Sequence, residues 1–229
     1  MGATLDTTDE PVEEEAPLRV LLVDDHDLFR TGLRNLLEEQ GIEIVGEAAD
    51  GANAVRLVRE LAPDVVVMDL NMPGVSGVEA TRQVTTAAPL TRVVVLTISD
   101  QDGDVLDAIL AGACGYLMKD ASIDELMAGI RAASIGESLI SSHIAGKVLQ
   151  RIRATSSQPE IAEAIRTELS DREIQVLKLI ANGKDNAMIA GELHISPKTV
   201  KNHISNILMK LQIENRIQAA VYAGRSGIV

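Results

Sequence analysis

Carboxylate, hydroxyl and amine side chains directly follow short apolar runs in the first half of the chain: Asp24, Asp25, Asp69, Thr97 and Lys119. Three carboxylates brought together repel one another, and a hard divalent cation such as Mg²⁺ relieves that repulsion by binding their oxygens. A carboxylate can also attack a phosphoryl group and form an aspartyl phosphate. Lys119 and Thr97 would then hold the phosphoryl oxygens by charge and hydrogen bonding. These residue types therefore predict phosphoryl transfer to a carboxylate beside a bound Mg²⁺.

Five apolar runs and five amphipathic stretches alternate along this half of the chain, and they must position those side chains. The predicted strands are 20–23, 42–45, 65–68, 93–96 and 116–118, and the predicted helices are 28–39, 52–61, 78–87, 105–111 and 123–133. This alternation predicts an α/β fold with a doubly wound, five-stranded parallel sheet. Ligands bind such sheets beyond the carboxyl ends of the strands, so the five side chains should meet at one rim.

The segments that carry these side chains resemble the receiver domain of response regulators. The similarity rests on residues 23–26, 63–74, 97 and 115–120, in the family's order and spacing, and it covers residues 18–136. It implies a flavodoxin-like fold in which Asp69 accepts phosphate from a histidine of a sensor kinase. It also implies that Asp24, Asp25, Asp69 and the backbone carbonyl of Asn71 surround Mg²⁺. Thr97 and Tyr116 would form the switch pair that reports phosphorylation.

A phosphatase or phosphotransferase with Asp69 as its nucleophile is the alternative from the enzyme class. Haloacid-dehalogenase-like enzymes need a second aspartate two residues after the nucleophile, and Asn71 stands there. The sequence therefore favours a protein that is not an enzyme. His26 is interpreted as a surface or capping residue and is left out of the predicted metal site.

Residues 166–229 have the pattern of four helices. Ser170 and Glu173 form a capping box, and Ser196-Pro197 is typical of an N-cap followed by the first helical residue. The first helix ends at Gly183, and the others are expected at about 186–193, 197–211 and 215–223. In the second helix Met188, Ile189 and Leu193 are expected to pack inward. In the third helix a buried stripe is expected at Val200, Ile204, Ile207, Leu208 and Leu211.

This block resembles the helix-turn-helix DNA-binding domain of the NarL/LuxR type. The similarity rests on residues 169–173 and 196–204. In a helix-turn-helix the second helix enters the major groove, where lysine suits phosphates or guanine and asparagine can bond adenine. The resemblance implies four DNA contacts, Lys198, Thr199, Lys201 and Asn202, with Thr199 on a phosphate. It also implies dimer contacts on the last helix, around Ala219, Ala220 and Tyr222.

The charge distribution supports a division into unlike parts. The whole chain has a net charge of −13, which alone would argue against nucleic acid. Residues 18–139 hold twenty acidic and nine basic residues, whereas residues 166–229 hold nine basic and six acidic ones. A mildly basic C-terminal module tethered to an acidic one fits double-stranded DNA as a partner. A ligand-sensing LuxR-type regulator is the other alternative, but its sensor domain would not need the acidic set.

Composition and segment boundaries complete the expectations. We predict an acidic disordered tail over 1–17, a receiver domain over 18–136, a linker with one helix over 137–165 and a DNA-binding domain over 166–229. The 229 residues contain no apolar run near the roughly 20 residues that a spanning helix needs, so no membrane partner is expected. One cysteine and no signal peptide fit a cytoplasmic protein. Phosphorylation is expected to release a recognition helix that the receiver masks, so that the active protein binds its operator as a homodimer.

Overall fold

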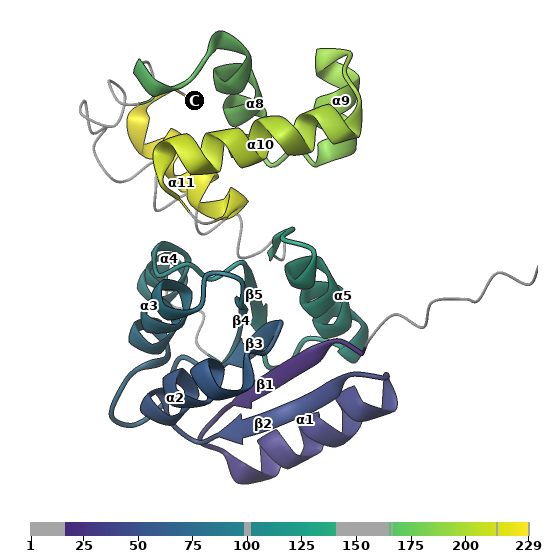
Figure 1. Ribbon diagram of the computed structural model, residues 1–229, viewed down its shortest axis with the longest axis vertical. Coiled ribbons are helices and arrows are strands. Elements are labelled where there is room, and N and C mark those ends of the chain that lie inside the picture. The colour runs from purple at the N-terminus through teal and green to yellow at the C-terminus, as the bar shows by residue number, and fades with distance from the viewer. Residues whose placement is uncertain (1–16, 99–101, 141–164, 166, 214, 229) are drawn as a thin grey trace, which may run out of the picture.

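The computed structural model describes residues 17–98, 102–140, 165, 167–213 and 215–228, and it folds them into two domains (Figure 1). A parallel sheet flanked by helices forms one domain, and a group of helices forms the other (Figure 1). The predicted fold class, a doubly wound α/β domain followed by an all-α helix-turn-helix domain, is confirmed.

The strands of the first domain run parallel in the order β2-β1-β3-β4-β5-β6. Their bounds are β1 Arg19–Val23, β2 Glu43–Ala48, β3 Val65–Met68, β4 Arg92–Thr97, β5 Gly115–Met118 and β6 Leu139–Ile140. The chain winds from β1 to β2 in one direction and to β3 in the other, so the order reverses beside β1. Such a reversal opens a crevice at the carboxyl ends of β1 and β3, where the acidic residues were predicted to meet.

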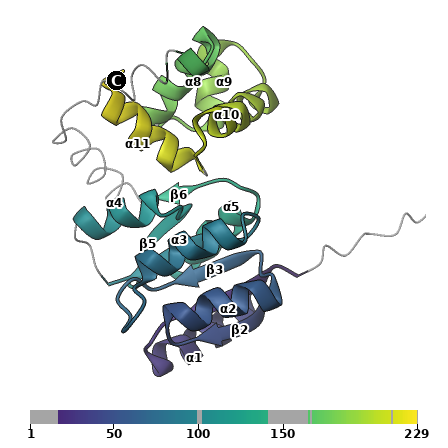
Figure 2. The ribbon, with the colours of Figure 1, turned by 60° about the vertical axis from the view of Figure 1, so that its left-hand side comes forward.

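Two layers of helices cover the two faces of the sheet (Figures 1 and 2). These helices are α1 Asp27–Glu39, α2 Gly51–Leu61, α3 Gly77–Ala87, α4 Asp102–Leu110 and α5 Ile123–Ser134. On one face Leu37 of α1 and Ile130 of α5 pack with Leu22 and Val67. Strand side chains alternate between faces, so an almost wholly apolar strand such as β3 supplies both layers.

The second domain consists of α8 Asp171–Ala181, α9 Asn186–Leu193, α10 Pro197–Leu211 and α11 Arg216–Ser226. The predicted capping box is present, since the side chains of Ser170 and Glu173 bond each other's backbone amides. Ser196 caps α10 and Pro197 is its first residue, as predicted. Ile189, Val200 and the other apolar residues of the predicted stripe pack into one core.

Two observations differ from the predictions, and two predicted segments lie outside the described residues. Met188 is 50% exposed, because it lies roughly 200° around α9 from the buried Ala190. The strand β6 pairs with β5, so the sheet extends into the segment expected to be a linker. The helix predicted in the linker and residues 1–16 of the predicted tail lie outside the described residues. Within the described part of the chain, no helix has both the length and the apolar character needed to cross a membrane.

Candidate functional site

The carboxyl ends of β1 and β3 bring the predicted acidic side chains together. Possible ligand atoms of Asp24, Asp25, His26 and Asp69 all lie within 4.8 Å of one another. Asp24 and Asp69 are only 5% and 1% exposed. Buried carboxylates at this spacing need cationic partners, because their desolvation and mutual repulsion are both unfavourable. His26, which was interpreted as a surface or capping residue, is the N-cap residue of α1, and its ring lies in this group as well.

Backbone contacts fix the position of Asp69. Its amide donates to the carbonyl of Val23 at 2.8 Å, which ties the end of β3 to the end of β1. The first residue of α3, Gly77, lies against the Asp69 peptide so closely that a Cβ there would stand 2.0 Å from the Asp69 carbonyl oxygen. The absence of a side chain at Gly77 therefore allows α3 to begin directly behind the predicted phosphate acceptor.

Lys119 joins the two buried carboxylates. Its Nζ lies 2.6 Å from Oδ2 of Asp24 and 2.7 Å from Oδ2 of Asp69, and its side chain is 9% exposed. Burial alone would lower the pKa of Lys119, but the hydrogen bonds to both aspartates outweigh it and raise that pKa. The ammonium also lies 4.7 Å from the ring centroid of Phe29, within cation–π range. Lys119 is therefore held charged between the carboxylates, in reach of any group bound to Asp69.

Arg30 is a part of the site that the sequence did not indicate. From α1 its guanidinium donates to the Asp24 carbonyl oxygen at 2.5 Å, to Asp27 at 2.6 Å and to Glu47 at 2.8 Å. Burial works against the charge, but the two carboxylates outweigh it and raise the pKa of Arg30. Arg30 thus fastens the loop after β1 to the end of β2. An arginine three residues after an aspartate is indistinguishable in the sequence from an ordinary helix-surface pair.

The donor set fits a hard divalent cation. Oδ1 of Asp25 is buried and accepts no hydrogen bond, although Nδ1 of His26 lies 2.8 Å away. An orphaned carboxylate oxygen beside two other carboxylates is what an oxygen-coordinated ion would satisfy. Asn71 is exposed at the rim, and its amide N–H points to Oδ1 of Asp69 at 3.4 Å. The side chains whose atoms could hold the metal together are therefore those of Asp24, Asp25, His26 and Asp69, and the carbonyl of Asn71 stays a predicted ligand.

The predicted switch residues are both fully buried. Thr97, at the end of β4, accepts a hydrogen bond from the Asn71 side chain at 3.4 Å, which links it to the rim of the site. Tyr116 on β5 packs in an apolar cluster with Leu106 and Ile109 of α4. That cluster also contains residues of α11 in the second domain, so it connects the sheet with the C-terminal domain.

The predicted DNA contacts lie in the first two turns of α10, and Lys201 among them faces the first domain. Lys198, Lys201 and Asn202 are exposed, and Thr199 is half-buried. The Thr199 hydroxyl is within 2.8 Å of the Ser196 hydroxyl, inside the cap of the helix. The helix N-terminus leaves backbone N–H groups available to an anion, and two lysines stand beside it. This end of α10 can approach a phosphate backbone.

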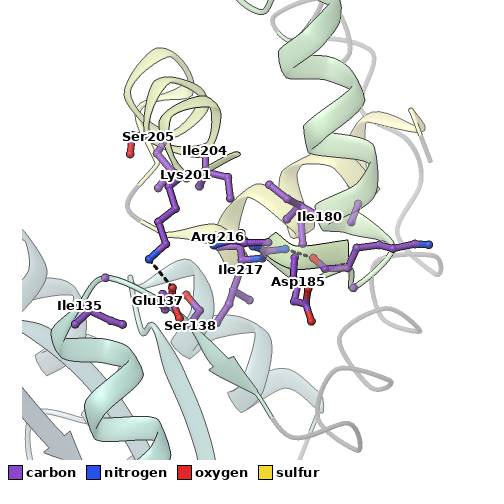
Figure 3. A pocket seen from close by; sticks show the side chains of 18 residues that line it. Ile135, Glu137, Ser138, Ile180, Asp185, Lys201, Ile204, Ser205, Arg216 and Ile217 are labelled. Atoms are coloured by element: carbon purple, nitrogen blue, oxygen red, sulfur yellow. Dashed lines mark hydrogen bonds and ion pairs between the residues drawn. The ribbon is translucent and has the colours of Figure 1, made fainter. Parts of the chain in front are cut away.

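A cavity of about 590 Å³ separates α10 from the first domain. Figure 3 shows Lys201 reaching from α10 across its edge to Glu137, with Nζ 2.9 Å from the carboxylate. Ile217 and Arg216 of α11 form another wall (Figure 3). Burial lowers the pKa of Arg216, although Asp185 and Glu137 oppose this effect. The guanidinium donates to the Lys184 carbonyl and to Asn186. Among the described residues, α11 packs against the first domain, and Lys201 of α10 forms an ion pair with it.

Comparisons with known proteins give the same division. The family profile of the response regulator receiver domain matches residues 20–131, and that of bacterial regulatory proteins of the luxR family matches residues 167–223. The transcriptional regulatory protein LiaR of Bacillus subtilis (strain 168) is 47% identical over 213 residues, which are 93% of this chain and 99% of that protein. The response regulator protein VraR of Staphylococcus aureus (strain NCTC 8325 / PS 47) is 38% identical with the same coverage of both chains. A solved structure of the response regulator ChrA of a heme-sensing two-component system is 36% identical, with a TM-score of 0.51, and covers 93% of this chain and 99% of that one.

Proposed function

The chain belongs to the response regulators that combine a receiver domain with a LuxR-type DNA-binding domain, and on that premise we propose that phosphorylation of Asp69 by a sensor histidine kinase controls its binding to DNA. The family is one of transcriptional regulators and not of classical enzymes. The observation that supports the proposal most directly is the buried bridge of Lys119 between Asp24 and Asp69 at the strand ends.

Asp69 is the proposed phosphate acceptor because it lies at the centre of the site. Its carboxylate is bonded by Lys119, and its backbone is fixed by β1 and by the start of α3. A nucleophile held in this way meets an incoming phosphoryl group in one orientation. Asn71 stands where a hydrolase would need its second carboxylate, so the aspartyl phosphate would persist as a signal.

Mg²⁺ is the proposed cofactor, held by Asp24, Asp25, Asp69 and the carbonyl of Asn71. When bound, it would neutralise the carboxylates and stabilise the charge on the transferring phosphoryl group. Lys119 has three N–H donors, so it can keep Asp24 and bind a phosphoryl oxygen in place of Asp69. Thr97 would donate to another phosphoryl oxygen, and Tyr116 on the neighbouring strand β5 would report the change to α4.

DNA is the proposed partner of the outer face of α10. Lys201 and Asn202 would read bases, and Lys198 and Thr199 would bind phosphates. A domain with so small a positive charge attracts DNA weakly, so we propose that two copies act together on neighbouring half-sites. We propose that the protein is cytoplasmic, where it would encounter both the sensor kinase and the DNA.

A comparison of the two aspartates that flank β3 tests the proposed function. Asp69 and the exposed Asp64 stand at opposite ends of β3. After incubation with Mg²⁺ and acetyl phosphate, the wild type and Asp64→Asn should gain one phosphoryl group by intact mass, and Asp69→Asn should gain none. In the first two proteins the modification should also tighten binding to DNA. Full labelling of Asp69→Asn would refute the assignment.

A further inference from the structure

The side-chain amide of Asn215 bonds both domains at once. Asn215 is 4% exposed and caps α11, since its Oδ1 accepts from the amides of Ile217 at 3.0 Å and Gln218 at 2.9 Å. Its Nδ2 donates to the carbonyls of Gly112 and Ala113 in the receiver, each at 3.1 Å. One buried side chain therefore starts a helix of the DNA-binding domain and holds the loop that follows α4.

Gln218, one turn along α11, makes the same kind of contact. It is 9% exposed, and its Nε2 donates to the carbonyl of Ile109 at 3.1 Å and towards that of Leu110 at 3.4 Å. The last carbonyls of a helix have no partner within the helix and must be satisfied from outside. The two amides of α11 supply donors for the C-terminal end of α4 and the loop that follows it.

Apolar packing extends this contact towards the phosphorylation site. Ile217 and Val221 of α11 are 8% and 1% exposed, and they lie in the same cluster as Leu106, Ile109 and the predicted switch residue Tyr116. Tyr116 and the polar contact thus share one helix, α4. A movement of α4 that follows Tyr116 would shift the carbonyls to which Asn215 and Gln218 donate.

The recognition helix is held far less firmly. Its ion pair between Lys201 and Glu137 joins side chains that are 56% and 43% exposed, and Lys198 and Asn202 are exposed as well. Exposed pairs of this kind contribute little to stability and are screened by salt. The interface therefore depends mainly on α11 and not on the DNA-reading face.

We infer that Asn215 and Gln218 form a latch through which the receiver holds the DNA-binding domain, and that phosphorylation opens this latch. The inference rests on the proposed function, and it identifies the contact of α11 with the receiver as the part of the protein that phosphorylation regulates. In the latched state α11 is bound to α4, and Glu137 stands at the base-reading Lys201, so DNA cannot use the whole face of α10. Release of α11 frees the domain as a unit.

The variant Asn215→Asp separates the two tasks of this side chain. Aspartate is as good an N-cap as asparagine, so α11 keeps its start. A carboxylate cannot donate, and its charge would face the carbonyl oxygens of Gly112 and Ala113. Gln218→Glu breaks the second contact in the same isosteric way. Gln175→Glu, at an exposed position of α8 that does not line the cavity between the domains, adds an equal charge and is the matched control.

The probe is a duplex selected from a random-sequence pool by the phosphorylated wild type, and affinity is measured with and without acetyl phosphate. Unphosphorylated Asn215→Asp and Gln218→Glu should bind this duplex at least about tenfold more tightly than the unphosphorylated wild type. Acetyl phosphate should then add little, and small-angle scattering should show a larger radius of gyration. Gln175→Glu should behave like the wild type in its response to phosphate. Thermal unfolding and labelling of Asp69 should be retained in all variants.

Each outcome separates the latch from the proposed function. If the wild type gains no affinity on phosphorylation, the proposed function fails. If the wild type responds but folded Asn215→Asp and Gln218→Glu bind no more tightly without phosphate than the wild type does, the latch is refuted. Glu137→Gln removes the ion pair of the recognition helix and leaves the amide contacts of Asn215 and Gln218 in place, so it should change basal affinity less than Asn215→Asp. The reverse order would assign the restraint to α10.

Discussion

The acidic site of the receiver and the recognition helix of the DNA-binding domain both depend on charged side chains, but they hold them in opposite ways. In the receiver, Asp24, Asp69 and Lys119 are nearly inaccessible, and each bonds a fixed partner. On α10, Lys198 and Asn202 are exposed. Phosphoryl transfer benefits from groups that are in place before the reaction, because reorganisation would add to the barrier. DNA binding depends on attraction to the negatively charged phosphates, and exposed cationic side chains can adjust their positions to those phosphates.

This difference predicts where substitutions are tolerated. In the receiver site, backbone position and side-chain pairing should matter together, so a small steric change should have large effects. On the recognition face, a substitution should alter affinity and leave the fold unchanged. The latch of Asn215 and Gln218 should be intermediate in its tolerance to substitution. It is buried like the receiver site, but it is proposed to open on phosphorylation.

The largest effect is expected for Gly77→Ala, which tests how rigidly the receiver site is built. The new Cβ would stand 2.0 Å from the Asp69 carbonyl oxygen, so the backbone of α3 or of Asp69 must shift. We expect a loss of about 1–3 kcal/mol in the free energy of unfolding. A displacement of about 1 Å at a reacting group can slow a reaction on the order of 100-fold, so labelling by acetyl phosphate should slow to that extent.

Gly32→Ala is the matched control for this prediction. Gly32 lies within α1, and a Cβ there meets no atom within 4 Å. Alanine in a helix interior is favoured over glycine by roughly 0.5–1 kcal/mol, so this variant should be at least as stable as the wild type. Urea unfolding and the rate of Asp69 labelling measure both variants. If Gly77→Ala matches Gly32→Ala in both respects, the site is less rigid than its geometry indicates.

A smaller effect is expected for Glu173→Gln, which tests a buried charge with a structural task in the DNA-binding domain. Glu173 is 4% exposed, completes the capping box of α8 and pairs with Lys210 at 2.7 Å. Burial would raise the pKa of Glu173, but the hydrogen bonds from Lys210 and Ser170 outweigh it and hold the pKa below its ordinary value. Glutamine keeps much of the capping box and loses the charge, so we expect about 1–2 kcal/mol of destabilisation at neutral pH.

The pH dependence of that difference has a definite sign. A carboxyl whose pKa is lowered by folding stabilises the protein above its unfolded pKa, and the stabilisation is lost as the pH falls through the folded pKa. The stability gap between the wild type and Glu173→Gln should therefore be full at pH 7 and should shrink below about pH 4. Urea unfolding at a series of pH values measures it. A gap that is independent of pH would mean that the charge of Glu173 is not involved.

Sequence patterns could predict the fold and the strand-end residues because both follow from local rules. Alternating apolar periods predicted the parallel sheet, and its geometry sends Asp24, Asp69 and Lys119 to one edge. The roles of Asn215 and Arg30 could not be predicted in this way. Asn215 has the appearance of an ordinary helix cap, and its second pair of partners lies 102 and 103 residues earlier in the chain. Such roles depend on how helices and strands that are distant in the sequence pack together, and a local sequence pattern does not show this.

Gly77 and Met188 illustrate the same limit. Gly77 looks like a poor first residue of a helix until the Asp69 peptide is seen behind it. Met188 fits an apolar helical period, but α9 has only eight residues and buries Ile189, as predicted, and Ala190 rather than Met188. A short helix offers few periods from which to choose its inner face, so small rotations change which residue is buried.

The smallest effect on the fold, and the clearest on binding, is expected for Lys198→Ala and Asn202→Ala on the recognition helix. Both residues are exposed, so neither change should alter the free energy of unfolding by more than about 0.5 kcal/mol. Lys198 stands at the start of α10, where a phosphate contact is proposed. Its loss should weaken binding to every duplex alike and lower the salt slope by about one. Asn202 is proposed to read a base, so its loss should cost about 1–3 kcal/mol on the selected duplex and little on a scrambled one. Affinity measured against salt on both duplexes distinguishes these roles. Equal weakening of both duplexes by Asn202→Ala would place that asparagine among the phosphate contacts. The recognition helix would then differ from the receiver site in the exposure of its side chains, and not in the recognition of a DNA sequence.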